Sequence, residues 1–140
     1  MRLFLKIFLA VVMAMPMVAS AQKAKLETVY LFGVGINFAD STVYLSAVER
    51  LDEVPLDRSQ GYLLNRYAYS EQLYQYLYTK AEMRNETCAV VFSTSRAKAE
   101  KRYLHLRRKM IKERGVRNVI EIPGGDFHFK AVPYRERTQN

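Results

Sequence analysis

Two apolar runs rich in β-branched and aromatic residues predict a pair of strands. In residues 28–38 (TVYLFGVGINF), apolar side chains occupy both alternating sets of positions, which is typical of a strand partly covered on both faces. Residues 42–48 (TVYLSAV) form a second run of this kind. Asp40 and Ser41 favour a tight turn between the two runs, which therefore predict an antiparallel hairpin.

Two later segments have the spacing of helices. Residues 71–83 carry apolar side chains every four positions, and Ser70 is a favourable residue at a helix start. The stripe consists of Leu73, Leu77 and Ala81. Residues 96–114 predict a longer helix with a narrow apolar stripe, ending at Gly115. This second stripe consists of Ala99, Tyr103, Leu106 and Met110.

Short apolar runs flank the second predicted helix. Residues 87–93 and 116–122 predict strands that the helix connects as a parallel crossover. Residues 127–131 predict a possible last strand, with Phe127 and Phe129 pointing to one side. Residues 49–57 are acidic and contain a proline, which favours a loop.

These elements predict the fold class. The order β-β-α-β-α-β indicates an α/β or α+β two-layer sandwich, with a mixed sheet of four to five strands and two helices packed on it. With 140 residues, of which 49% are apolar and 26% charged, the chain has the composition of one folded domain, which argues against complete disorder.

The N-terminus predicts export. Residues 1–21 combine two basic residues, an apolar stretch and a small-residue cleavage site at Ala19-Ser20-Ala21, as secretory signal peptides do. The alternative is an uncleaved anchor helix. Cleavage leaves residues 22–140 as a single α/β domain without a membrane span, located in the periplasm or secreted.

The charge distribution predicts an anionic partner. The chain has 22 Lys and Arg against 14 Asp and Glu, a formal net charge of +8. Residues 91–140 hold 13 of these cations and only 5 of the acidic residues. Outside the cytoplasm, such a surface suits lipid headgroups, cell-wall polymers or acidic proteins, and export argues against nucleic acid. A solvated basic face without a partner is the alternative.

Two helical surfaces supply the candidate binding residues. On the basic helix these are Arg102, Arg107, Arg108 and Lys109. Leu104 and Ile111 form a second apolar line on this helix, so it is either buried on two sides or meets a partner, including another copy of the chain. On the other helix, Tyr74 and Tyr78 suit a protein interface or carbohydrate stacking, with packing at the core edge as the alternative.

Few residues point to catalysis or to a cofactor. A single cysteine excludes an intramolecular disulfide framework and a multi-Cys zinc site, and we expect no cofactor. Gly33-Val34-Gly35 lacks the third glycine and the following helix of a phosphate loop, so it predicts a bulge or a close backbone approach. We expect a protein that is not an enzyme.

A hydrolase is the alternative to this expectation. Glu49, Asp52, Glu53 and Asp57 lie close together in the sequence and supply paired carboxylates. A concave grouping of Asp52 and Glu53 with His128 would favour a hydrolase of the cell envelope.

Two resemblances add to this interpretation. Residues 90–122, through Ser95, Ala97, Ala99 and Glu100, are similar in outline to half of a sporulation-related repeat (SPOR) domain, which implies peptidoglycan binding. Over most of residues 22–140, the chain resembles small secreted proteins of Bacteroidetes-type bacteria whose activities are not established. The segments that carry this resemblance are VYLFGVGINFADSTVYLS, TCAVVFSTSRAKAEKRYLHLRRK and DFHFKAV. It implies an extracytoplasmic bacterial setting and no catalytic residues.

Overall fold

The fold is a five-stranded mixed sheet with one helix on each face. The computed structural model describes residues 24–80, 86–112 and 118–135, and all its elements lie within these ranges. The strands are β1 (Ala24–Asn37), β2 (Thr42–Ser46), β3 (Glu49–Asp57), β4 (Glu86–Ser93) and β5 (Asn118–Ile122). The helices are α2 (Arg66–Lys80) and α3 (Arg96–Lys112). The predicted mixed sheet of four to five strands with two helices is thereby confirmed.

Strand β1 is the centre of the sheet. On one side it pairs antiparallel with β3 and then with β2, and on the other side it pairs antiparallel with β4. Strand β5 joins the outer side of β2 in parallel. Strands β4 and β5 therefore run in the same direction with β1 and β2 between them, as the predicted parallel crossover through α3 requires.

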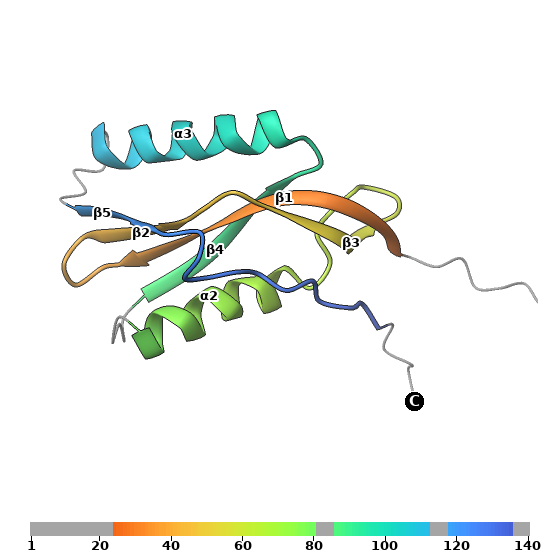
Figure 1. The fold of residues 1–140 in the computed structure, drawn as a ribbon, viewed down its shortest axis with the longest axis horizontal. Helices are drawn as coiled ribbons and strands as arrows, with labels where there is room; N and C mark the ends of the chain where they lie inside the picture. The colour runs from red at the N-terminus through yellow and green to blue at the C-terminus, as the bar shows by residue number, and fades with distance from the viewer. Residues whose placement is uncertain (1–23, 81–85, 113–117, 136–140) are drawn as a thin grey trace, which may run out of the picture.

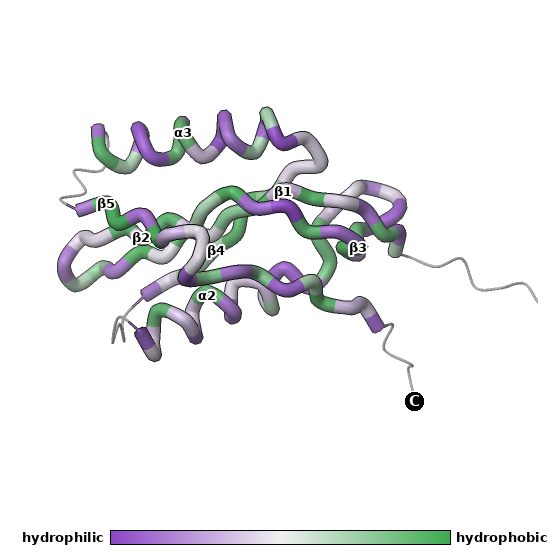
Figure 2. The backbone as a smooth tube through the Cα atoms, in the orientation of Figure 1, coloured by the Kyte–Doolittle hydropathy of each residue, from purple (hydrophilic) through white to green (hydrophobic). Residues whose placement is uncertain are grey.

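The two helices cover opposite faces of the sheet, so the fold has three layers rather than the two predicted (Figure 1). Helix α3 packs on an α3-side cluster, whose buried members are Phe32, Val34, Val43, Leu45 and Met110. Helix α2 packs on a larger α2-side cluster that includes Val29, Leu31, Tyr69, Leu73, Leu77 and Val90. Figure 2 shows the resulting hydrophobic centre of the sheet between two helices of mixed character.

Residues after β5 complete the α2 layer. The C-terminal segment, here residues 127–133, runs beside α2 and is not a strand, which corrects the possible last strand (Figure 1). Phe129 is buried in the α2-side cluster and His128 points to solvent, so the predicted alternation of side chains holds. The backbone of the segment forms hydrogen bonds with side chains of α2 instead of with a neighbouring strand. The Gln72 side chain donates to the Lys130 carbonyl and accepts from the Lys130 amide, and the Val132 amide donates to the Tyr69 hydroxyl at 2.9 Å.

Two boundaries differ from the prediction. Residues 49–57 form β3 and not a loop, because they pair with the first half of β1. Helix α2 begins at Arg66, five residues before the predicted start, so Ser70 lies inside the helix and does not cap it. Ser95 does cap α3, since its backbone and side-chain oxygens accept from the Ala99 and Lys98 amides. Residues 1–21, 81–83 and Gly115 lie outside the described residues.

Candidate functional site

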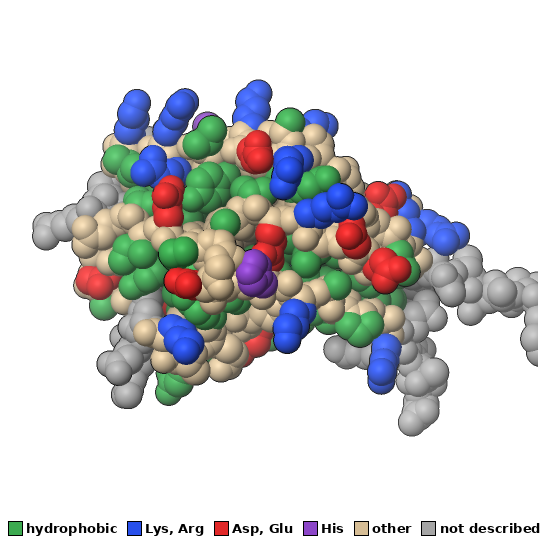
Figure 3. Space-filling model, in the orientation of Figure 1, with side chains coloured by type: hydrophobic (Ala, Val, Ile, Leu, Met, Phe, Trp, Pro, Cys, Tyr) green, Lys and Arg blue, Asp and Glu red, His purple; other side chains and the backbone are tan. Residues whose placement is uncertain are grey.

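The outer surface of α3 carries most of the exposed positive charge. Between Arg96 and Lys112 the helix has eight Lys and Arg and a single Glu. Its predicted inner stripe does face the sheet, which turns most of the cations toward solvent. Lys and Arg side chains accordingly project from the edge of the molecule along which α3 lies (Figure 3). The helix therefore presents a broad cationic surface.

Internal contacts divide the four candidate cations of α3 into two pairs. Arg102 donates to the Phe92 carbonyl at 2.9 Å, and the Arg107 Nε lies 3.1 Å from a carboxylate oxygen of Glu121. Arg108 and Lys109 are exposed and form no ion pair with any other residue that the structure describes. Arg108 and Lys109 are thus the members of the predicted set that remain available to a ligand.

Glu121 fixes the flank of α3 against β5. It accepts from the Tyr103 hydroxyl at 3.1 Å as well as pairing with Arg107. Burial, and then this hydrogen bond to a carboxylate, raise the pKa of Tyr103 to about 12. The phenol therefore stays protonated and remains a hydrogen-bond donor throughout the physiological pH range. Its hydrogen bond to Glu121 connects α3 to β5.

The second apolar line of α3 is exposed. Leu104 and Ile111 keep 51% and 45% of their surface accessible, and the seven-residue spacing puts them on the same side of the helix. Lys101 and Arg108 are neighbours of Leu104 on this side, three and four residues away. The α3 surface therefore combines two apolar side chains with a surround of cations, an arrangement found on helices that lie on charged surfaces.

The tyrosine candidates lie on the other helix. Tyr74 and Tyr78 stack with ring centroids 6.2 Å apart, and Tyr78 is 45% exposed. By contrast, Tyr69 is fully buried and Tyr76 packs on Phe127, so these two belong to the core. Because α2 and α3 cover opposite faces of the sheet, the structure does not bring the tyrosines and the basic residues together into one site.

The acidic residues of β3 are separated by the strand itself. The Glu49 carboxylate accepts from the Phe129 amide and lies 3.1 Å from His128. Asp52 instead accepts from Thr28 and Arg50 at 2.8 and 3.0 Å. These two hydrogen bonds hold the pKa of Asp52 below its usual range.

Asp57 has a third and local role. It accepts from the Ser59 hydroxyl and the Gln60 amide, and it thereby shapes the turn after β3. The grouping of Asp52 and Glu53 around His128 that a hydrolase would need is not among the contacts of the described residues. His128 pairs with Glu49 instead.

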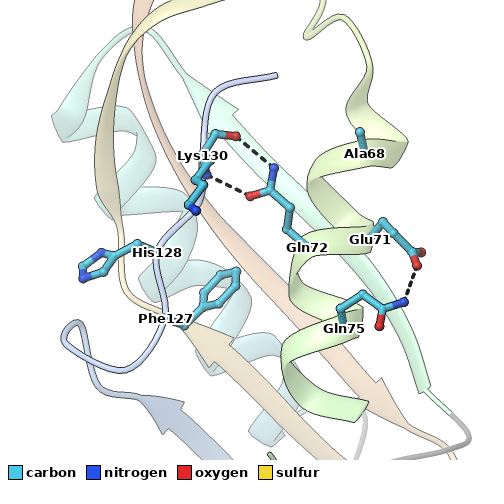
Figure 4. A pocket seen from close by; sticks show the side chains of 7 residues that line it. All are labelled: Ala68, Glu71, Gln72, Gln75, Phe127, His128 and Lys130. Atoms are coloured by element: carbon cyan, nitrogen blue, oxygen red, sulfur yellow. Dashed lines mark hydrogen bonds between the residues drawn. The ribbon is translucent and has the colours of Figure 1, made fainter. Parts of the chain in front are cut away.

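A shallow groove separates α2 from the C-terminal segment (Figure 4). It has a volume of about 450 Å³ and is lined by Ala68, Glu71, Gln72, Gln75, Phe127, His128 and Lys130. Gln72 reaches across it to Lys130, and Gln75 donates to Glu71 at 2.8 Å, so both amide side chains are already bonded. His128 points away from α2. The groove is the seam that holds the segment on the helix, and the sequence shows no motif for it.

Cys88 has the environment of an inert thiol. Burial, and then the negative charges of Glu86 and Glu71, raise its pKa to about 12. The thiol therefore stays protonated at neutral pH. The thiolate that would act as a nucleophile or a metal ligand is disfavoured here.

Removing the Glu49 side chain tests its role in holding the C-terminal segment. We expect Glu49→Ala to lower the free energy of unfolding by about 1–2 kcal/mol, because it strands the Phe129 amide. Glu53→Ala on the same strand is the matched control, expected to change stability by less than about 0.5 kcal/mol since that side chain is exposed. Urea unfolding measures both, and equal losses would contradict a specific role for Glu49.

Comparison with known proteins adds no assignment. No protein-family model, curated protein or solved structure matches the chain. Neither of the described helices is long and apolar enough to cross a membrane. Within the described ranges, no group of three or more His, Cys, Asp or Glu side chains is placed to hold a metal ion.

Proposed function

We propose that this chain is an exported, non-catalytic binding domain of the bacterial cell envelope that docks on an anionic surface through α3. The single observation that carries the proposal is the outer surface of α3, where exposed cations surround Leu104 and Ile111. Residues 1–21, with the features of a signal peptide, support the extracytoplasmic setting. The basic helix is the recognition element, and no residue is assigned a catalytic role.

Electrostatics favours a surface over a small ligand. The exposed cations of α3 lie on the outer side of the helix, and none of them lines the groove beside α2, so they offer an extended surface and not an enclosure for a small anion. An extended array of negative charge, such as an envelope polymer or a layer of anionic headgroups, meets several of them at once. Each cation near an anionic lipid surface contributes about 1 kcal/mol, so an array of four to six supplies about 4–6 kcal/mol, which is sufficient for reversible attachment.

Charge removal on α3 tests the proposal. Residues 22–140 contain every strand and helix that the structure describes and serve as the test protein. The variant K101Q/R108Q/K109Q/K112Q neutralises four exposed cations of α3. We expect at least a tenfold loss of binding to cell-wall sacculi or to vesicles with anionic lipid at low salt. Four cations at about 1 kcal/mol each allow a larger effect.

A matched variant controls for net charge. K25Q/R58Q/K80Q/K130Q removes the same number of charges from other parts of the surface and should bind nearly as well as the parent. Raising the salt concentration should weaken binding of the parent, because exposed charges are screened beyond about 10 Å at 0.1 M. Equal losses in both variants, or no binding of the parent to either probe, would overturn the assignment to α3.

A further inference from the structure

Strand β4 leaves one edge of the sheet open. It pairs only with β1 among the described strands. Arg66 donates to the Val90 carbonyl and Arg102 to the Phe92 carbonyl, so both carbonyls point away from β1. Because main-chain groups alternate along a strand, every second residue from Glu86 to Phe92 directs its N–H and C=O outward. An unpaired edge of this length is a template for another strand.

The two ends of this edge carry opposite charge. Arg66 and Arg102 reach the second half of β4 from the two helices. Glu86 opens the first half, and neither oxygen of its buried carboxyl has a hydrogen-bond partner among the residues that the structure describes. That burial raises the pKa of Glu86 to about 7. In the monomer, the buried carboxyl of Glu86 thus has no hydrogen-bond partner among the described residues at one end of β4. At the other end, the guanidinium groups of Arg66 and Arg102 are bonded to backbone carbonyls.

The tyrosine stripe of α2 lies on the side of this edge. Residues four apart share one side of a helix, and Arg66, which reaches β4, is followed at this spacing by Ser70, Tyr74 and Tyr78. Gln72, on the opposite side of α2, contacts the C-terminal segment. Each step of four residues turns by about 40° around the helix, so Ser70 and Tyr74 stay near the side from which Arg66 reaches the open edge, and Tyr78 lies further round.

We propose that the open edge binds a second copy of the chain, with the two β4 strands pairing antiparallel across a two-fold axis at Ala89. This register places Cys88 of one copy opposite Val90 of the other, so their outward amides and carbonyls bond each other. The two sheets become one continuous sheet, and the Tyr74 and Tyr78 rings of the two α2 helices face each other across the axis.

The register also pairs the unsatisfied charges. Glu86 comes to lie opposite Phe92 of the second copy. Its carboxyl, buried and unpaired among the described residues of the monomer, turns outward there to meet Arg66 of the second copy. Arg66 exchanges the Val90 carbonyl for this carboxylate, and the freed carbonyl accepts from the Cys88 amide. Both contacts occur twice, once on each side of the axis. A second copy is favoured over a foreign strand because this sequence itself supplies the acidic residue at the position where the edge is basic.

Charge exchange tests the dimer. Light scattering and sedimentation of residues 22–140 should give twice the monomer mass. Glu86→Arg and Arg66→Glu should each give a monomer, since each places like charges together, and the double variant should restore the dimer. A monomeric parent at the highest soluble concentration would overturn the proposal. So would a dimer that survives both single variants, because its interface would lie elsewhere.

Cross-linking tests the register independently of folding stability. In a Cys88→Ala background, Ala89→Cys puts two thiols in a non-hydrogen-bonded pair with Cα atoms about 4.5 Å apart, where mild oxidation should form a disulfide. Thr87→Cys in the same background is the matched control. It is also exposed but faces residue 91 of the second copy, so it should not cross-link. Equal cross-linking of both variants would contradict the proposed register.

Discussion

Replacing Phe32 by alanine is expected to lower the free energy of unfolding by about 3–5 kcal/mol, the usual cost of deleting a buried phenyl ring. Phe32 is a residue of β1, and its side chain is fully buried beneath α3. Its ring meets the Tyr103 ring edge to face, with centroids 5.2 Å apart. The α3-side cluster has only four other buried members, so little apolar contact remains to hold the helix. Urea unfolding followed by circular dichroism measures the loss.

Phe38→Ala is the matched control for this substitution. Phe38 follows β1 and is 71% exposed, so its removal should change stability by less than about 0.5 kcal/mol. If α3 is the recognition element, Phe32→Ala should also weaken binding to anionic vesicles under conditions where the sheet is still folded, because the helix loses its anchor. Equal unfolding midpoints for the two variants would contradict the role assigned to Phe32.

The hairpin and α3 were predictable because local chemistry determines them. The Asp40 carboxylate accepts from the Thr42 amide, and Ser41 adopts a φ of 57°, so the turn forms where short polar residues allow it. Ser95 and the stripe from Ala99 to Met110 similarly determine where α3 starts and which side of it is buried. In these segments, pattern and tertiary structure agree.

Strand β3 and the start of α2 were not predictable from local pattern. The acidic residues and Pro55 of segment 49–57 predicted a loop. Asp52 and Glu53 are instead exposed side chains of a strand that gains its hydrogen bonds from β1, on the far side of β2 in the sequence. Gly61, which disfavours a helix at its own position, adopts a φ of 74° in the turn before α2 and leaves the helix intact. Long-range pairing with β1 decides β3.

The layer arrangement and the position of the candidate site depend on which face of the sheet each helix covers. Helical spacing does not determine this. An apolar stripe says which side of a helix is buried but not which face of the sheet it covers. The stripes of α2 and α3 therefore left their relative position open, and Tyr74 and Arg108 lie on opposite faces of the sheet. The contact of Arg66 with β4 likewise crosses 24 positions, and no motif marks it.

Gly33→Ala is expected to lower the free energy of unfolding by about 1–3 kcal/mol, because a methyl group there overfills the α2-side cluster. A Cβ at Gly33 would lie 2.6 Å from Cδ2 of Leu73 and 3.0 Å from Cζ of Phe129. Leu73 is fully buried and Phe129 nearly so, so neither side chain has free space to move into. The close approach of α2 to β1 is the reason for the glycine. Of the two alternatives predicted for Gly33-Val34-Gly35, a bulge or a close backbone approach, the structure shows the second at Gly33.

Two effects of this substitution oppose each other. Replacing glycine by alanine also restricts the unfolded chain, which by itself stabilises a protein by about 0.4–1 kcal/mol. At Gly33 the steric overlap is the larger effect, because β1 is held from both sides by its neighbours and cannot recede from the helix. The Gly33 amide is held in addition by the Ser46 hydroxyl at 2.6 Å.

Gly125→Ala isolates the second effect. Gly125 lies in the turn after β5, where a Cβ would meet nothing within 4 Å and the backbone is outside the left-handed region. This substitution should leave stability unchanged or raise it by up to about 1 kcal/mol, opposite in sign to Gly33→Ala. Urea unfolding of both variants measures the difference. A shift of the same sign and size at the two sites would contradict the close packing of α2 on β1 at Gly33.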